Sequence, residues 1–425
     1  MEWIKNQDLR FLNKRKLNES SEQEKTVRGI INCVKIQGDA ALRDYTNRFD
    51  GVKLEDLKVT NEEIASSYQN TSKEIVEIIK EAAANIRAFH EKQKPDSWQD
   101  TQSDGTVLGQ RVTPLDAVGV YVPGGTAAYP SSVLMGAIPA LAAGVEKVVM
   151  VSPPQDNGTV ADGALIAANE IGLTDIYKVG GAQAIAALAY GTETIPKVDK
   201  IVGPGNQFVA LAKREVFGTV DIDSLAGPSE IVVLADDSAD PKWIAADLLS
   251  QAEHDPLSMA VLVTPSEMLG KAVESEVESQ LAALPRKAIA ERSINDFGKI
   301  ILVEQLEGGA AVVNQLAPEH LEVIVEQKKE EKILKAIKHA GAIFIGPYSS
   351  EPVGDYFAGP NHIIPTNGTA RFGSPLSVES FVKRSSIIRY SRQALEDNAA
   401  KIAGFARYEG LEAHARAVEA RIKEC

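Results

Sequence analysis

The sequence predicts an α/β fold with two open parallel sheets flanked by helices, together with a helical region contributed by the two ends of the chain. Its 425 residues, 44% hydrophobic and 24% charged, are too many for one ordinary core. From about residue 115, short β-branched runs alternate with helical stretches, as in βαβ units that build a parallel sheet. The number of these runs favours two sheets over one.

The elements follow in order along the chain. Residues 1 to about 95 place apolar residues three and four apart, as amphipathic helices do, for example at 74–79. The expected strands are 117–121, 147–151, 176–179, 201–202, 231–234, 260–263, 300–303 and 342–345. After about residue 385 the helical pattern returns at 394–407 and 411–423, which are rich in Ala, Glu and Arg. We therefore expect helices at both ends of the chain and the sheets between them.

Composition and charge exclude several classes of function. The formal net charge is −14. Binding to nucleic acid requires concentrated Lys and Arg, so a protein with this charge is not expected to bind it. The most apolar stretch, 133–145, is short and contains Pro139, so it cannot cross about 30 Å of hydrocarbon as a helix. The first residues, 1–5, turn polar at once and carry no export signal. We expect a cytoplasmic protein with neither a nucleic-acid nor a membrane partner.

The two cysteines constrain the chemistry. Cys33 lies in an early amphipathic segment and Cys425 is the last residue, and neither stands in a CxxC or catalytic context. A thiol-dependent aldehyde oxidation needs a positioned, activated cysteine. We therefore expect neither a disulfide framework nor a cysteine nucleophile.

Three glycine-rich turns follow expected strands, at 121–125, 179–183 and 202–206. Glycine at such a turn lets the backbone approach a ligand and exposes amides that favour a phosphate. However, the chain contains no G-x-G-x-x-G or P-loop pattern. Strand-to-helix turns also use glycine for their backbone geometry alone. The turns by themselves do not establish a nucleotide site.

Two short motifs combine groups that can bind metal or move protons. Gln251 and His254 are three residues apart at the end of an expected helix, so both can face one ion. The alternative is an exposed polar pair. Glu319 stands beside His320, which suits proton transfer near neutral pH, just before the apolar run 323–325. The alternative there is a polar turn entering a strand.

Two further polar segments carry candidate residues. Asp355 lies in the segment 354–362, whose many turn-forming residues predict a loop beyond the strand at 342–345. The alternative is an ordinary turn residue. Glu409 and His414 open the last expected helix, where a capping segment is the simpler interpretation. Four of the six histidines fall in these polar segments: His254, His320, His362 and His414.

Seven motifs in this order and spacing, spread over almost the whole chain, resemble the histidinol dehydrogenase family. They are YVPGG at 121–125, VGGAQA at 179–184, VGPGN at 202–206, AGPSE at 226–230, QAEH at 251–254, APEH at 317–320 and GDY at 354–356. The resemblance implies Rossmann-like sheets that hold NAD without the usual fingerprint. It also implies three regions: a helical dimerisation region (1–22 and 376–425), a Rossmann-like domain with the metal site (23–130 and 230–375), and a second Rossmann-like domain with the NAD contacts (131–229).

The resemblance also assigns roles to residues of this chain. One zinc ion per subunit would be bound by Gln251, His254, Asp355 and His414, with His414 supplied by the partner subunit of a domain-swapped homodimer. Glu319 and His320 resemble the acid–base pair. The substrate contacts implied are Ser229, Gln251, His254, His320, Asp355, Glu409 and His414, and the NAD contacts are Tyr121, Gln183 and Asn206.

The implied activity is the zinc-dependent oxidation of L-histidinol through L-histidinal to L-histidine with two NAD, the last steps of histidine biosynthesis. An alternative is a related zinc and NAD dehydrogenase for another small alcohol, such as a sulfonated diol, but no added cationic donors for a sulfonate stand near the motifs. A cysteine-dependent aldehyde dehydrogenase lacks its thiol. A binding protein with a structural zinc would use four Cys or His ligands, whereas this set includes Gln and Asp. We therefore expect a catalytic site.

Overall fold

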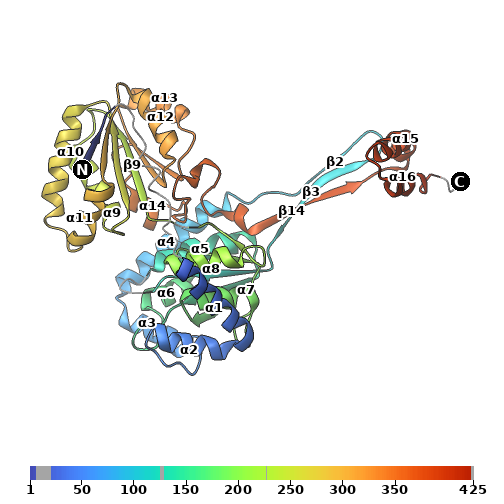
Figure 1. Cartoon of the computed structure of the whole chain (residues 1–425), viewed down its shortest axis with the longest axis horizontal. Helices are drawn as coiled ribbons and strands as arrows, with labels where there is room; N and C mark the ends of the chain where they lie inside the picture. Colours follow the sequence, from blue (N-terminus) through green and yellow to red (C-terminus); the bar gives the residue numbers. More distant parts are fainter. Residues whose placement is uncertain (6–20, 125–128, 226, 423–425) are drawn as a thin grey trace. The chain divides into compact units, whose positions relative to one another are not determined.

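The computed structural model describes residues 1–5, 21–124, 129–225 and 227–422. The chain forms two compact units, each described here by itself (Figure 1). The main unit comprises Met1–Gln93 and Asp116–Ser380, and the small unit comprises Lys94–Leu115 and Phe381–Cys425. The main unit contains two parallel sheets flanked by helices, which confirms the predicted α/β class.

The first sheet of the main unit has five parallel strands in the order β6-β5-β4-β7-β8. Its strands are β4 (Ala117–Tyr121), β5 (Lys147–Ser152), β6 (Asp175–Lys178), β7 (Lys200–Val202) and β8 (Asp221–Ile222). The connecting helices are α5 (Pro130–Ala143), α6 (Asp162–Glu170), α7 (Gly181–Tyr190) and α8 (Gln207–Val216). The central strands are almost entirely buried, as in a parallel sheet covered on both faces.

The N-terminal helices belong to this five-stranded sheet. They are α1 (Ser21–Gln37), α2 (Asp39–Phe49), α3 (Asn61–Asn70) and α4 (Lys73–Glu91). Helix α1 packs on α7 and α8, α3 packs on α6, and α4 packs on α5 and α6. Val27 and Ile31 of α1 share one apolar core with Ile185 of α7. The prediction grouped residues 23–130 with 230–375, whereas these helices bury their apolar faces against the five-stranded sheet. The domain boundaries stay a prediction.

The second sheet of the main unit has six parallel strands in the order β1-β11-β10-β9-β12-β13. They are β1 (Glu2–Ile4), β9 (Glu230–Ala235), β10 (Met259–Thr264), β11 (Lys299–Leu302), β12 (His320–Ile324) and β13 (Ala342–Ile345). The helices are α9 (Pro241–Ala252), α10 (Glu267–Leu281), α11 (Lys287–Phe297), α12 (Leu306–Leu316), α13 (Gln327–Ala336) and the short α14 (Glu351–Tyr356), with a 3₁₀ turn at Thr369–Arg371. Trp3 pairs with Ile300, so the first residues are a strand of this sheet and not part of a helical terminal region.

The small unit combines a ribbon of strands with two helices. Its antiparallel sheet has the order β14-β3-β2, formed by β14 (Val382–Arg389), β3 (Val107–Pro114) and β2 (Trp98–Thr101), and a 3₁₀ turn at Val378–Phe381 precedes β14. Helices α15 (Arg392–Tyr408) and α16 (Glu412–Glu419) pack against each other (Figure 1). The two predicted C-terminal helices are confirmed. The ribbon was not predicted, because its mostly exposed strands bury no continuous apolar face that would leave a periodic pattern.

Residues 133–145, the most apolar stretch of the sequence, form most of the buried helix α5, with Pro139 inside it. Within the described parts of the chain, no helix has both the length and the apolar character needed to cross a bilayer.

Candidate active site

The predicted acid–base pair lies at the amino end of β12, beside the amino end of the neighbouring strand β9. His320 is the first residue of β12 and pairs in register with Ile231 of β9. The backbone N–H of Glu230 donates to Oε2 of Glu319 at 2.8 Å, and Nδ1 of His320 lies 3.0 Å from the carbonyl oxygen of Glu230. Because a carbonyl oxygen only accepts, Nδ1 of His320 carries the hydrogen of this bond. The other ring nitrogen, Nε2, is then the one that faces the rest of the site.

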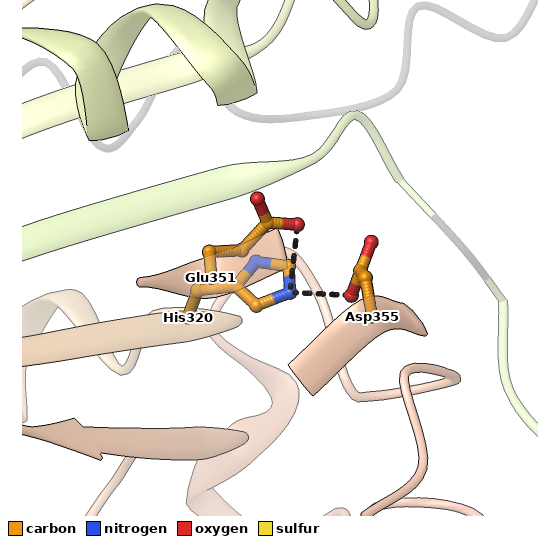
Figure 2. A group of neighbouring side chains, drawn as sticks. All are labelled: His320, Glu351 and Asp355. Atoms are coloured by element: carbon orange, nitrogen blue, oxygen red, sulfur yellow. Dashed lines mark ion pairs between the residues drawn. The ribbon is translucent and has the colours of Figure 1, made fainter. Parts of the chain in front are cut away.

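Two carboxylates face Nε2 of His320 (Figure 2). The nearest oxygen of Asp355 is 3.8 Å away and that of Glu351 is 3.9 Å away. Both acids belong to α14 and are four residues apart, so they lie on the same side of the helix. Between them, the Cα of Gly354 packs against the ring of Phe344 in β13, where a Cβ would come within 2.7 Å of a ring carbon. This close packing brings the two acids alongside His320.

Helix α14 corrects the prediction of a loop for the segment 354–362. Residues 354–356 are helical, because the helix begins earlier, at Glu351, with Pro352 in its first turn. The prediction considered only the turn-forming residues after Asp355. It also placed the site beyond the carboxyl ends of the strands, whereas β9 and β12 contribute their amino ends. Helix α14 follows β13 in the sequence but contacts the first and third residues of β12.

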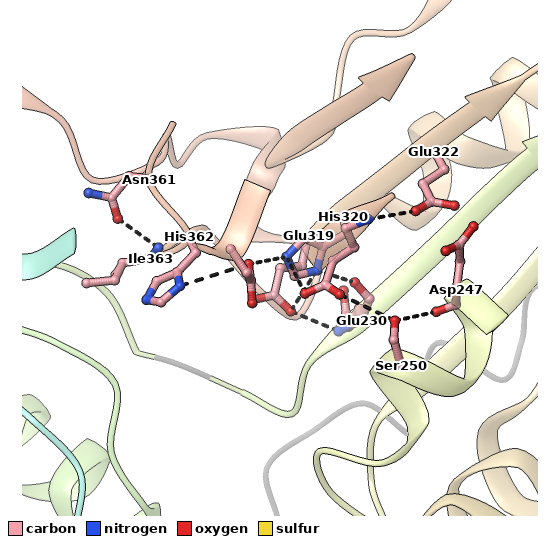
Figure 3. Close-up of polar contacts among 11 residues, drawn as sticks. Glu230, Asp247, Ser250, Glu319, His320, Glu322, Asn361, His362 and Ile363 are labelled. Carbon is pink, nitrogen blue, oxygen red and sulfur yellow. Dashed lines mark hydrogen bonds and ion pairs between the residues drawn. The ribbon is translucent and has the colours of Figure 1, made fainter. Parts of the chain in front are cut away.

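Further polar groups complete this cluster (Figure 3). The hydroxyl of Ser250 in α9 donates to Oε2 of Glu351 at 3.3 Å. Nδ1 of His362 lies 3.9 Å from Oδ1 of Asp355. The cluster therefore draws on α9, β9, β12, α14 and the segment that follows α14.

The electrostatics of the cluster favour a positive charge. Burial raises the pKa of Glu319 to about 8, and burial together with Asp355 raises that of Glu351 to about 8. Burial lowers the pKa of His320, but Glu319, Asp355 and Glu351 outweigh it and raise the value to about 9. Burial raises the pKa of Asp355, but the nearby imidazoles of His320 and His362 outweigh burial and make the net shift downward. Around His320, Glu319 and Glu351 are buried and Asp355 is half-buried. Their negative charges are stabilised when a proton or a bound cation lies among them.

The donor atoms of the cluster fit a transition-metal ion. Gln251 is fully buried, and neither atom of its amide has a hydrogen-bond partner among the described residues. In the same described parts of the chain, Nε2 of His320 and Oε1 of Glu351 also lack one. Buried polar atoms without partners cost free energy, which a ligand would recover. Amide and carboxylate oxygens and imidazole nitrogens are all metal ligands.

The structure brings some of the predicted metal ligands together. Gln251 is the penultimate residue of α9, and its carbonyl oxygen accepts the backbone N–H of His254 at 3.2 Å. The pKa of His254 is lowered by loss of solvent, although the charge of Asp355 acts in the opposite direction. Among the described residues, one group of three or more His and acids has the spacing to hold an ion, namely His320, Glu351 and Asp355. This group shares only Asp355 with the predicted set.

The remaining predicted site residues lie in different places. Ser229 is half-buried directly before β9, beside Glu230. Glu409 and His414 belong to the small unit, at the end of α15 and in α16, and both are exposed. Their assignment to the site stays a prediction. Gly125 and Ala226 of the glycine motifs lie outside the described residues.

The three predicted NAD contacts line one pocket. Tyr121, Gln183 and Asn206 surround a cavity of about 1030 Å³ at the carboxyl ends of β4, β6 and β7. Ligands of open α/β sheets bind at this edge. The hydroxyl of Tyr121 accepts the backbone N–H of Gly181 at 3.1 Å, and burial raises the pKa of this tyrosine to about 12.

The glycines of these turns are required by the packing of the backbone itself. A Cβ on Gly124 or Gly180 would collide with the ring of Pro153. A Cβ on Gly203, whose φ is +115°, would collide with the carbonyl oxygen of Tyr121. The interpretation of these turns as tight chain geometry is therefore confirmed, and their part in binding a ligand stays a prediction.

Sequence reasoning missed Glu351, Glu322 and Asp247, and it noted His362 in a polar segment without giving it a role. A signal was present for the first three. Glu351 precedes Asp355 by four residues on a helix, Asp247 precedes Gln251 by four, and Glu322 follows His320 by two on a strand. Each pair faces the same side of its element.

A buried imidazole with adjacent acids and a separate glycine-lined pocket beyond the strands of an α/β sheet are features of an oxidoreductase that uses a dinucleotide. The family model described as histidinol dehydrogenase matches residues 13–422. Curated histidinol dehydrogenases are similar over 95% of this chain, at 62% identity for the protein of Geobacillus kaustophilus (95% of its length) and 60% for that of Bacillus subtilis (94%). The crystal structure of histidinol dehydrogenase from Elizabethkingia anophelis superposes with a TM-score of 0.95 at 38% identity, covering 100% of this chain and 98% of that one. The chain belongs to the histidinol dehydrogenase family, whose members catalyse the last steps of histidine biosynthesis.

Proposed function

We propose that this chain oxidises L-histidinol through L-histidinal to L-histidine with two NAD in the cytoplasm, using zinc. The observation that carries the proposal is the arrangement around His320. Its Nδ1 is fixed by the carbonyl of Glu230, and its Nε2 faces an acidic cluster beside Glu319. The similarity to histidinol dehydrogenases supplies the substrate.

Zinc would be held by Gln251, His254 and Asp355 together with His414 of the partner subunit. The unpaired amide of buried Gln251 supports a ligand at this position. When bound, zinc supplies a positive charge that orients the amine and imidazole of the substrate and offsets the charge of Asp355 beside His320.

His320 takes the proton of the substrate hydroxyl in the first oxidation. The nearby acids raise the pKa of His320 to about 9, so the ring must first lose a proton to act as a base. Because Nδ1 donates to Glu230, this proton leaves from Nε2, which then has the free lone pair. The carboxylates of Glu319 and Asp355 stabilise the imidazolium that forms.

Glu319 takes a proton from the water that hydrates the aldehyde. One oxygen of its carboxylate is held by the backbone N–H of Glu230, so the other is left for the water. A buried carboxyl with a raised pKa is a stronger base than an exposed one. No thiol takes part.

When bound, NAD would supply the hydride acceptor for both oxidations. Tyr121, Gln183 and Asn206 would contact NAD in the pocket that they line, where Tyr121 also accepts the backbone N–H of Gly181. Ser229 and Glu409 would contact substrate, and the active enzyme would be a homodimer that exchanges its C-terminal helices.

The test is a stoichiometric assay with and without a chelator. We expect two NADH per L-histidinol, complete loss of turnover after zinc is removed, and recovery when zinc returns. Full turnover by metal-free protein would exclude the proposed role of zinc, and one NADH per substrate would exclude the second oxidation.

A further inference from the structure

Helix α14, which carries Glu351 and Asp355, begins without a cap of its own. The N-cap residue, Ser350, makes no side-chain capping bond. Instead the backbone N–H of Glu351 donates to Oε1 of Glu322 at 3.0 Å in a buried position. The first backbone N–H groups of a helix have no acceptor within the helix. In α14 the carboxyl group of Glu322 in β12 provides the acceptor that the side chain of Ser350 does not.

Glu322 couples this helix to the strand that carries His320. It follows His320 by two residues in β12, and residues two apart in a strand point to the same face. Its side chain is only 1% exposed, so it has little freedom to move. One strand therefore holds both the imidazole and the group that anchors the acids facing it.

Asp247 of α9 fixes the other side of Glu322 (Figure 3). Figure 3 draws the carboxyl group of Asp247 beside that of Glu322. Burial raises the pKa of both groups, and the neighbouring Asp247 adds to the rise for Glu322, so this pair favours holding a proton. The carbonyl oxygen of Asp247 also accepts from Ser250, whose hydroxyl reaches Glu351. Glu322 thus connects β12, α9 and α14 at the three points from which the cluster is built.

We propose that Glu322, held by Asp247, is a positioning residue that fixes α14 against β12 so that Glu351 and Asp355 face Nε2 of His320. The effect of Glu322 on zinc affinity rests on the proposed function, which places Asp355 among the zinc ligands. Replacing a buried pair of charged groups by apolar residues of similar volume often leaves the free energy of unfolding unchanged or higher. Stability of the fold therefore does not by itself account for this acid pair. Its use here is to hold the helix in one place.

The test compares three variants with a matched control. Glu322→Gln keeps an acceptor for the N–H of Glu351 and gains donors for Asp247, whereas Glu322→Leu removes both contacts. Asp247→Asn retains the pairing of the side chains. Asp236→Leu is the control, because Asp236 is a buried acid directly after the neighbouring strand β9 that accepts the backbone N–H of Glu326 at 3.4 Å and binds Lys329 away from the cluster.

Two readouts are used: hydrogen exchange of the peptide that contains α14 in metal-free protein, and zinc affinity by competition with a chromophoric chelator. In Glu322→Leu we expect exchange in α14 to be at least about tenfold faster and zinc affinity to fall by about 10- to 100-fold, the effect typical of residues that orient metal ligands. In Glu322→Gln and Asp247→Asn both should stay within about threefold of the native protein. Asp236→Leu should leave both unchanged even where its melting temperature falls.

The proposal is overturned if α14 exchanges normally in Glu322→Leu, or if Glu322→Gln or Asp236→Leu matches the effect of Glu322→Leu. Absence of zinc binding by the native protein would instead refute the proposed metal site. The exchange rate of α14 would then still decide whether Glu322 positions the helix.

Discussion

At the scale of single residues, the backbone of Glu230 organises the acid–base pair. Its N–H holds Glu319 and its carbonyl oxygen fixes Nδ1 of His320. In the proposed mechanism each side chain therefore offers the substrate the atom that Glu230 does not hold, an oxygen of Glu319 and Nε2 of His320. This division underlies two predictions about the two oxidation steps.

Replacing the two residues should affect the two steps unequally. Glu319→Gln should slow oxidation of L-histidinal by about 10²- to 10⁴-fold and oxidation of L-histidinol much less, because only the second step needs an activated water. His320→Asn should show the reverse preference. Rates measured separately with the alcohol and the aldehyde test this, and equal losses in both steps for both variants would contradict it.

The aldehyde step should also depend on pH through Glu319. An acid with its pKa raised to about 8 is protonated below that value and becomes the carboxylate as the pH rises through it. We expect kcat/KM for L-histidinal to increase between about pH 7 and 9 in the native protein. In Glu319→Gln this increase should disappear, and a similar increase in that variant would assign the titration to another group.

The cysteines should not matter for turnover. Cys33 is half-buried beside the core of the five-stranded sheet, and Cys425 lies outside the described residues. Replacing both by serine should leave both oxidations within about twofold of the native rate, since no activated thiol is used. A selective loss of aldehyde oxidation in the folded double variant would support a covalent thiol intermediate.

At the scale of elements, Asn206 has two roles that can be separated. It is the N-cap of α8, where its side chain accepts the backbone N–H groups of Phe208 and Val209 at 3.0 and 3.2 Å, and it lines the proposed NAD pocket. The sequence predicted only the second role.

Asn206→Ala should lower the free energy of unfolding by about 1 kcal/mol and raise KM for NAD. Asn206→Ser should restore the cap and the stability but not KM, because the shorter side chain still accepts at the helix end. Thr60→Ala, which removes the capping box of α3, is the matched control and should lower stability alone. If the serine variant also recovers KM, the effect on NAD comes from the helix and not from contact.

At the scale of the whole molecule, the proposed dimer can be tested by mixing inactive chains. His254→Ala and His414→Ala should each be inactive, because every zinc site lacks one ligand. If His414 is supplied by the partner subunit, a mixed dimer contains one intact site and one doubly damaged site. Refolding equal amounts together should recover about a quarter of native activity, since about half the dimers are mixed. No recovery, with mixed dimers demonstrated by different tags, would place all ligands in one chain.

The alternation of strand and helix patterns was sufficient to predict the α/β class and most strands of both sheets. Short-range spacing also identified the pairs Gln251 with His254 and Glu319 with His320. These features depend on the period of apolar residues and on neighbours in sequence, which a single chain displays directly.

Only the tertiary structure decided which elements meet. It assigned the N-terminal helices to the five-stranded sheet and the first strand to the six-stranded sheet, because burial of an apolar face does not specify its partner. It also brought Glu351 of α14 and Asp247 of α9 to β12. The sequence alone does not distinguish a buried acid from one exposed to solvent. The function of an acid depends on its burial and its neighbours, which only the folded structure provides.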